Sequence, residues 1–305
     1  MELSWNGKDI TEYVNITGCV HRDFSSGKSD CLELTLDHAS TWYRWGPEED
    51  DEIIFTHNGY STGKLYLNTV MPVGDKFRVL ATSIKRAAAR KAWATYRNTT
   101  LQGIFDTCSA ECGMSGKLFG LDGSFPYQYV IRENEGCAAF LDRIGKWEGA
   151  TVKAFDGSMR GVSVLYAQNR TADQALTIRA DQEGVIYRRR DNTKYSSLTI
   201  NTPYAKATAR DSTVKGNNAP IITYLPALDD VQAGRWARGL LLMHNRQAEE
   251  IEIETELNIA MTALARVEIK SDTDMLGSWL VDEAEHDFFN RRPSIKMLRV
   301  IDTIQ

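Results

Sequence analysis

The side chains able to carry acid–base chemistry are few, and they are scattered along the chain. The five histidines are His21, His38, His57, His244 and His286. His286 lies in the acidic stretch 282–287, where a carboxylate could orient its imidazole for proton transfer. A lone histidine among acids at a strand end is far more often a structural residue. We therefore expect no catalytic role for His286.

Five adjacent acids at residues 48–52 could supply a glycosidase carboxylate pair or a cation site. Adjacent carboxylates repel and are not held opposite one another, so a solvated loop is the better interpretation. The aromatic residues Trp42, Tyr43 and Trp45 come just before this run. They are too many for one turn to bury alone. The sequence leaves two alternatives open for them, the core or a subunit interface, where Trp and Tyr are enriched.

Other chemical motifs are incomplete. Residues 27–29 (Gly-Lys-Ser) resemble the end of a phosphate-binding loop, but Arg22 stands where that loop requires a glycine. Cys108 and Cys112 are one helical turn apart and could clip a metal, yet both fall on the apolar face of an expected helix. That position favours buried, small hydrophobic side chains. We predict no catalytic, cofactor-binding or metal-binding residue, no cofactor, and a protein that is not an enzyme.

The charge balance argues against a nucleic-acid-binding protein. The net charge is −5, whereas affinity for nucleic acid depends on lysine and arginine. The basic runs at residues 85–91 and 188–190 are expected to be solvated surface or subunit contacts. The odd count of five cysteines indicates a reducing compartment. The sequence shows neither a signal peptide nor the roughly 20 consecutive apolar residues that span a bilayer, so no membrane insertion is expected.

The periodicity of apolar residues predicts strands at both ends of the chain. Leu32, Leu34 and Leu36 alternate with polar residues, and Asn58-Gly59 favours a tight hairpin. Helical spacing follows at residues 101–112 and 137–147, and each helix is followed by a glycine. From residue 175 onward strands dominate again, including a strict alternation over residues 251–259.

This order of elements predicts a mainly β chain with an α+β insertion, in which two β-barrels flank a small α+β domain. We expect the first β-barrel domain at residues 1–88 and the middle α+β domain at residues 89–185. The second β-barrel domain is expected at residues 186–305, with a helix inserted at residues 229–247.

Five segments resemble the late-control D family of phage baseplate hub proteins. The start at residues 5–14 and the strand at 31–37 are similar to the tube-like beginning of tail hubs, and the helix at 101–113 resembles the family's leucine-rich helix that ends in glycine. Residues 133–149, followed by Phe-Asp-Gly at 155–157, resemble the family's acidic-start helix and Asp-Gly turn. The strand from Gly277 to His286 is similar to the family's glycine, aromatic, valine and histidine strand.

The resemblance implies a structural role in a contractile phage tail or tailocin, similar to the first module of type VI secretion spike proteins. Such hubs form a homotrimeric ring, with two tube-protein-like β-barrels in each subunit, that joins a hexameric tail tube to a trimeric central spike. The implied partners are the chain itself, the spike, the tube or its initiator, and other baseplate proteins. DNA would only pass through the lumen. The implied location is the tail baseplate of a virion or tailocin particle assembled in the bacterial host cytoplasm.

For this role we expect a subunit interface in the segment 41–54, built from Trp42, Tyr43, Trp45, Glu48 and Asp51. An aromatic anchor beside a charged run is the arrangement of an interface core with a polar rim. Two alternatives come from other classes. One is a tail-associated cell-wall hydrolase, and the other is a carbohydrate-binding β protein.

Overall fold

The computed structural model describes residues 1–179, 181–290 and 293–304, apart from the side chain of Tyr43. Strands hold 44% of the chain and helices 21%, so the prediction of a mainly β protein is confirmed. Among the described helices, none is both long and apolar enough to cross a membrane.

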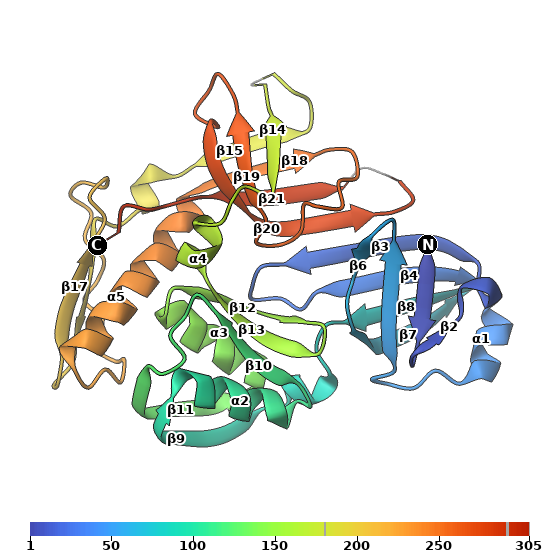
Figure 1. Ribbon diagram of the computed structural model, residues 1–305, viewed down its shortest axis with the longest axis horizontal. Coiled ribbons are helices and arrows are strands. Elements are labelled where there is room, and N and C mark those ends of the chain that lie inside the picture. The colour runs from blue at the N-terminus through green and yellow to red at the C-terminus, as the bar shows by residue number, and fades with distance from the viewer. Residues whose placement is uncertain (180, 291–292, 305) are drawn as a thin grey trace.

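The N-terminal half of the main sheet follows from the alternation seen in the sequence (Figure 1). Leu32, Leu34 and Leu36 all point into the core and are fully buried. The turn at Asn58-Gly59 has the positive φ angles of a tight hairpin, 48° and 83°. The elements are β1 (Glu2–Trp5), β2 (Lys8–Asp9), β3 (Ile16–Phe24), β4 (Cys31–Asp37), α1 (Ala39–Trp45), β5 (Glu52–His57), β6 (Tyr60–Ser61), β7 (Leu65–Val73) and β8 (Lys76–Thr82).

The C-terminal half of the sheet has its own apolar core, centred on Trp279 and the isoleucines of the neighbouring strands. Its strands are β14 (Gln174–Thr177), β15 (Val185–Arg189), β18 (Glu249–Glu254), β19 (Arg266–Lys270), β20 (Gly277–Asp287) and β21 (Ser294–Arg299). The strand β18 ends at Glu254, so the predicted strand over residues 251–259 is too long. Leu257 and Ile259 continue the alternation of apolar residues beyond the end of β18, because they pack against the core of the N-terminal half.

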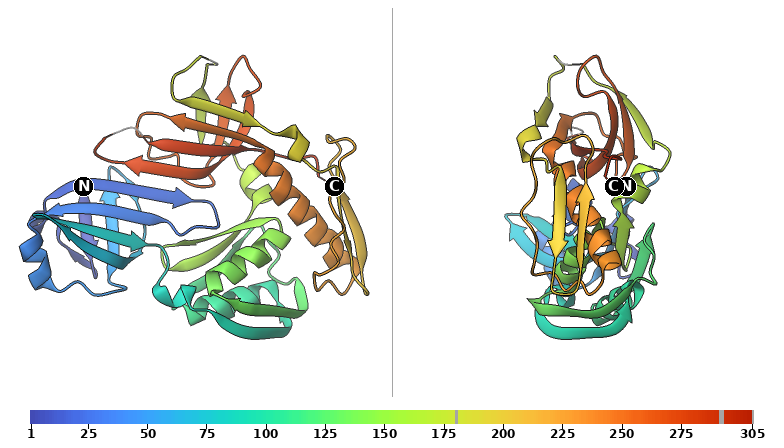
Figure 2. Two further views of the ribbon diagram at one scale, coloured as in Figure 1. Left: turned by 180° about the vertical axis from the view of Figure 1, so that it is seen from behind. Right: turned by 90° about the vertical axis from the view of Figure 1, so that its left-hand side faces the viewer.

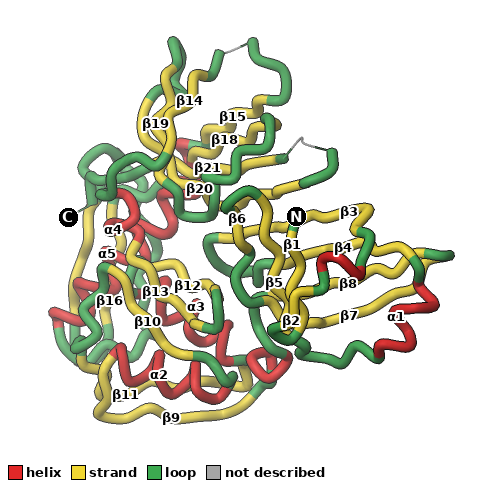
Figure 3. Tube along the Cα trace, turned by 45° about the vertical axis from the view of Figure 1, so that its right-hand side comes forward, coloured by secondary structure: helices red, strands yellow, loops and turns green. Residues whose placement is uncertain are grey.

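The two halves are one continuous sheet of fourteen strands, in the order β15-β18-β21-β20-β3-β4-β8-β7-β5-β1-β2, with β14, β19 and β6 beside this path. The long strand β20 makes the connection, because its first part pairs with β19 and its second part pairs with β3. In the part of the chain that the structure describes, neither half closes into a barrel. The prediction of two separate barrels is therefore not confirmed. Figure 3 shows the strands of the two halves meeting at β3 and β20.

The middle of the chain packs helices against short sheets. Its elements are β9 (Ala92–Thr100), α2 (Leu101–Glu111), β10 (Ser115–Phe119), β11 (Pro126–Glu135), α3 (Cys137–Trp147), β12 (Ala150–Phe155), β13 (Ser158–Ser163) and α4 (Val164–Gln168). Helix α2 begins where the Thr100 hydroxyl accepts a hydrogen bond from Gly103 N. The predicted helices at 101–112 and 137–147 are confirmed.

A hairpin and the longest helix complete this unit: β16 (Ser197–Asn201), β17 (Lys206–Arg210) and α5 (Asp230–Asn245). Their apolar side chains share one core with α2 and α3. Figure 2 shows the hairpin lying along α5, away from the continuous sheet. The packing thus divides residues 186–305 between two cores, a division that the sequence does not predict.

Helices α3 and α5 approach at two glycines. After α3, Gly149 has a φ of +67°, the left-handed conformation that glycine favours. A Cβ added to Gly239 of α5 would lie 2.2 Å from Trp147 O and 2.4 Å from Gly149 N. Next to this contact, the buried Glu148 carboxylate accepts hydrogen bonds from Arg235 Nε at 2.6 Å and Trp236 Nε1 at 2.8 Å. The position of α5 is therefore fixed by backbone contact and by a buried ion pair.

Candidate functional site

The tryptophans of the predicted interface have different environments. Helix α1, which the sequence did not predict, turns Trp42 inward, where its ring stacks on Phe77 with 5.7 Å between centroids. Trp42 is only 4% exposed, whereas Trp45 is 44% exposed. The Trp45 ring covers Trp5 at 5.3 Å and Trp42 at 4.8 Å. Trp42 is therefore a core residue, whereas the Trp45 ring lies at the surface. The side chain of Tyr43 lies outside the described residues.

The acidic run beside α1 is a structured turn. Asp51 accepts hydrogen bonds from Trp5 Nε1 at 2.9 Å, Asn6 Nδ2 at 2.6 Å and Glu48 N at 3.0 Å. Partial burial raises the pKa of Asp51, but these hydrogen bonds outweigh it and hold the pKa below its usual value. Glu49 pairs with Arg86 at the surface, at 2.8 Å. The carboxylates of Glu49 and Asp51 thus bind separate partners and are not opposed to each other as in a glycosidase.

The other chemical candidates lie apart from one another. His286 is fully buried on β20, and Cys108 and Cys112 are buried on α2. Among the described residues no group of three or more His, Cys, Asp or Glu side chains is arranged to hold a metal ion. Lys28, from the incomplete phosphate-loop motif, pairs with Glu283 at 3.2 Å. The structure does not bring these candidates together into one reactive site.

A polar cluster lies instead where β3 and β20 pair, and we call it the sheet junction. It comprises His21, Asp23, Asp30, Tyr60, Lys153 and His286. His21 and His286 are directly opposite each other in the ladder that joins the two halves. The Tyr60 hydroxyl lies 2.5 Å from His21 Nδ1. His21 Nε2 and both ring nitrogens of His286 have no hydrogen-bond partner within the described part of the chain.

Lys153 connects the middle unit to this junction. It extends from β12 to pair with Asp23, and its Nζ lies 3.2 Å from Asp30 Oδ2. All three charged side chains are less than 10% exposed. Burial lowers the pKa of Lys153, but the two carboxylates outweigh this effect and raise it to about 12. The ammonium therefore stays charged and links units that lie far apart in the sequence.

This cluster was not predicted from the sequence. Its signal was a lysine alternating with apolar residues in β12 (Ala-Thr-Val-Lys-Ala-Phe), where an unpaired charge would be too costly to bury. A cavity of about 490 Å³ borders the cluster, with Arg160, Tyr166 and Arg170 in its lining. Asp23 also accepts a hydrogen bond from Ala263 N at 2.8 Å. Because Lys153 and Asp23 bind each other, neither is available as a general base, and the cluster is suited to holding units together.

The buried histidines predict a loss of stability in mild acid. Burial lowers the pKa of His21 to about 3, although Asp23 opposes the shift; His286 and Lys153 reinforce it. Burial likewise lowers the pKa of His286, against the opposing charge of Asp23. At these two histidines the unfolded chain therefore binds protons first, whereas burial raises the pKa of Asp30 to about 7 and gives that carboxyl the opposite effect. The stabilisation is complete above about pH 6.5 and falls as the pH drops, by up to about 1.4 kcal/mol per pH unit for each histidine.

Urea unfolding between pH 4.5 and 7.5 measures this slope. The variant His286→Leu should show a shallower slope than the wild type over the same range, because one imidazole no longer binds a proton on unfolding. Equal slopes for the two proteins would contradict the assignment.

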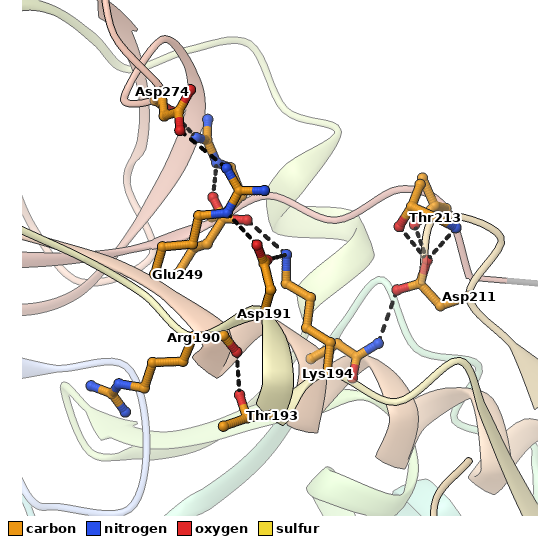
Figure 4. Close-up of polar contacts among 12 residues, drawn as sticks. Arg190, Asp191, Thr193, Lys194, Asp211, Thr213, Glu249 and Asp274 are labelled. Atoms are coloured by element: carbon orange, nitrogen blue, oxygen red, sulfur yellow. Dashed lines mark hydrogen bonds and ion pairs between the residues drawn. The ribbon is translucent and has the colours of Figure 1, made fainter. Parts of the chain in front are cut away.

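A second polar network ties the hairpin unit to the C-terminal half of the sheet (Figure 4). Glu249 of β18 accepts from Lys194 Nζ at 2.7 Å and from Arg299 Nε at 2.9 Å. Asp211 accepts from Asn245 Nδ2 of α5 at 2.9 Å. The basic run 188–190 is paired throughout, with Glu250, Glu252, Asp191 and Asp274 as its acidic partners. These arginines thus serve internal contacts.

Comparison with solved structures finds the same fold in tail proteins. The 43 kDa tail protein of prophage MuSo2 from Shewanella oneidensis matches with a TM-score of 0.72 at 14% identity, over 100% of this chain and 99% of that one. A tail protein from Neisseria meningitidis matches with a TM-score of 0.75 at 9% identity, over 99% of this chain and 96% of that one.

A third structure is an Escherichia coli component of the type VI secretion system, described as structurally similar to the bacteriophage T4 tail proteins gp27 and gp5. It matches with a TM-score of 0.58 at 11% identity, over 99% of this chain and 78% of that one. No family model and no curated protein matches the sequence. The chain therefore shares, over nearly its whole length, a fold found in phage tail proteins and in a type VI secretion component.

Proposed function

We propose that this protein is a structural baseplate hub of a contractile phage tail or tailocin, of the late-control D type. Three copies would form a ring that joins a hexameric tail tube to a trimeric central spike. The observation that carries the proposal is the fold shared with the MuSo2 tail protein, which spans 100% of this chain and 99% of that one. A match of both chains end to end supports the same architecture throughout.

The continuous sheet and the buried ion pairs suit a protein that must withstand mechanical load. A fourteen-stranded sheet runs through the molecule without interruption, and buried ion pairs attach the middle unit to it. Both ends of the sheet's main strand path, β15 and β2, lack a further partner strand within the described residues. Such edges can pair with another chain. In this proposal the net charge of −5 repels the phosphates of DNA, so DNA that passes through the lumen does not bind to its wall.

Measuring the mass in solution tests the hub function. Light scattering and native mass spectrometry should show a trimer, either for the protein alone or after addition of a trimeric tail spike protein. A monomer that responds to neither the spike nor the tube protein would remove the hub proposal. Zymography on cell-wall substrate tests the hydrolase alternative, and we expect no clearing.

We also propose that Trp45 anchors the subunit interface, with Glu48 at its rim. The variant Trp45→Ala should weaken trimer formation by at least tenfold, because exposed aromatic anchors often dominate interface energies. The monomer should stay folded with a lower unfolding midpoint, because the Trp45 ring also packs on Trp5 and Trp42. Native mass spectrometry across a dilution series measures the effect.

The matched control for this test is Tyr13→Ala, which removes another exposed aromatic, 84% exposed, from the same half of the sheet. Trp42→Ala is unsuitable, because Trp42 belongs to the core and its loss reports on folding. A Trp45→Ala trimer as tight as that of Tyr13→Ala would exclude Trp45 from the interface.

A further inference from the structure

The cavity of about 490 Å³ beside the sheet junction lies where three parts of the chain meet. Its lining comes from β3 and β6, from β10, β12, β13 and α4 of the middle unit, and from residues 259–264 before β19. The volume falls within the range of pockets that hold small molecules. A ligand in this cavity would therefore lie between the N-terminal half of the sheet, the middle unit and the C-terminal half.

Three cations line the cavity, and two of them already have acidic partners. Lys153 is held by the two carboxylates of the sheet junction, and Arg170 pairs with Asp173 at 3.0 Å. Arg160 of β13 forms no ion pair with any residue that the structure describes. Burial lowers the pKa of Arg160, and the charge of Asp156 opposes this shift without forming an ion pair. The lining thus contains a partly buried cation that an anion from outside the chain could neutralise.

Neighbouring groups hold the Arg160 side chain in place. Its guanidinium carbon lies over the Phe155 ring, 4.5 Å from the ring centroid, and its Nε donates to Ser158 Oγ at 2.9 Å. Neither terminal amino group has a hydrogen-bond partner within the described part of the chain. Two such groups form a planar fork that matches the two oxygens of a carboxylate. The guanidinium is therefore oriented before any anion binds.

Aromatic rings supply an apolar part of the lining. Phe119, Phe155 and Tyr166 all border the cavity. Phe119 is 36% exposed and Tyr166 is 46% exposed, so a ligand could cover both rings. A Cβ added to Gly120 would lie 2.1 Å from Tyr166 Cβ, which shows how closely Tyr166 packs on the backbone. Aromatic side chains pack best against flat, apolar groups.

A buried histidine adds an unsatisfied hydrogen-bond donor. His21 lines the cavity and is 2% exposed. Donation from the Tyr60 hydroxyl to His21 Nδ1 leaves the fewest groups unsatisfied, and it places the proton of the neutral ring on Nε2. This nitrogen has no partner among the described residues. An unsatisfied donor in the interior costs free energy, which a ligand oxygen would offset.

We propose that this cavity binds a small monocarboxylate with a flat, apolar body, of the aryl-alkyl carboxylate class. The carboxylate pairs with the terminal amino groups of Arg160, and the body of the ligand lies among Phe119, Phe155 and Tyr166. One unpaired cation balances one negative charge, whereas a phosphate dianion would leave charge uncompensated in a partly apolar site. The recognition uses side chains of a single chain, so it does not depend on the proposed tail function.

Isothermal titration calorimetry of the full chain with phenylpropionate tests the site. We expect saturable one-to-one binding, and the melting temperature should rise with ligand concentration because the ligand binds the folded state. Three further probes separate charge from shape. Acetate lacks the ring, phenylethylamine carries the opposite charge, and inorganic phosphate is a larger anionic charge without an apolar body. Each should bind about tenfold more weakly than phenylpropionate, or weaker still.

Two variants test the role of Arg160. Arg160→Gln removes the charge and keeps a polar side chain, and it should weaken phenylpropionate binding about tenfold or more. The matched control is Arg170→Gln, which changes the same cavity. Because Arg170 is already paired with Asp173, its loss should change the affinity less than about threefold. Melting temperatures of both variants without ligand check that they fold.

The proposal would be overturned if phenylpropionate did not bind the wild-type protein, or if phenylethylamine or phosphate bound as tightly. An equal loss of affinity in the two variants would exclude Arg160 as the residue that selects the carboxylate.

Discussion

Replacing Lys153 by alanine is expected to lower the free energy of unfolding by about 3–5 kcal/mol. Lys153 is the cation that compensates two carboxylates, Asp23 and Asp30, in a site shielded from water. Removing it leaves uncompensated negative charge in the interior, and that cost exceeds the cost of the lost side-chain contacts. The loss should appear in urea or thermal unfolding at pH 7.

Two variants make this test specific. Lys64→Ala also removes a lysine from an ion pair, with Glu52 at 2.9 Å, but that lysine is 43% exposed. Its effect should stay below about 1 kcal/mol. The triple variant Lys153→Met, Asp23→Asn, Asp30→Asn should regain much of the stability, because no charge then remains buried. A Lys153→Ala protein as stable as Lys64→Ala would show that the junction ion pairs do not hold the units together.

The second large effect is expected at Gly239, where helix propensity and packing predict opposite signs. Alanine is favoured over glycine inside a helix by about 1 kcal/mol, so propensity alone predicts a more stable protein. The added Cβ would instead lie 2.2 Å from Trp147 O, and neither backbone can yield without separating α3 from α5. We expect Gly239→Ala to lose about 3 kcal/mol.

Gly234→Ala is the matched control because it lies in the same helix. Its Cβ would meet only Ala207 Cβ, at an ordinary contact distance of 3.7 Å. This variant should gain up to about 1 kcal/mol. If both alanine variants gained stability, the close contact between the two helices would be wrong.

The elements predicted correctly are those with strong local patterns. Strand β4 and helices α2 and α3 carry regular apolar periodicity, and the structure buries the residues that this periodicity selects. Strand β9 escaped prediction because two of its inward-facing residues, Ala92 and Ala94, are small and give only a weak apolar period. Helix α1 escaped because its seven residues are too few to show a helical period.

The pairing of β20 with β3 could not be read from local sequence, because both strands look like ordinary half-buried strands. Only their contact across the chain joins the halves into one sheet. The positions of the predicted interface residues likewise could not be read from local sequence. A pattern of aromatics cannot say which tryptophan turns inward, and the φ of 64° at His38, before α1, sets the direction in which Trp42 and Trp45 point.

Because the sheet is continuous, it cannot be completed until the C-terminal strands have been synthesised. Arg22 of β3 forms an ion pair with Glu285 of β20, which is synthesised 263 residues later. At bacterial translation speeds of about 5–20 residues per second, that interval is roughly 13–50 s. Throughout it the outer edge of β3 has no neighbouring strand, a condition that invites pairing with other nascent chains. The charged side chains of Arg22 and Asp23 on that strand disfavour its pairing with strands of other chains. The residues that later join the two halves of the sheet therefore also reduce aggregation of the incomplete chain.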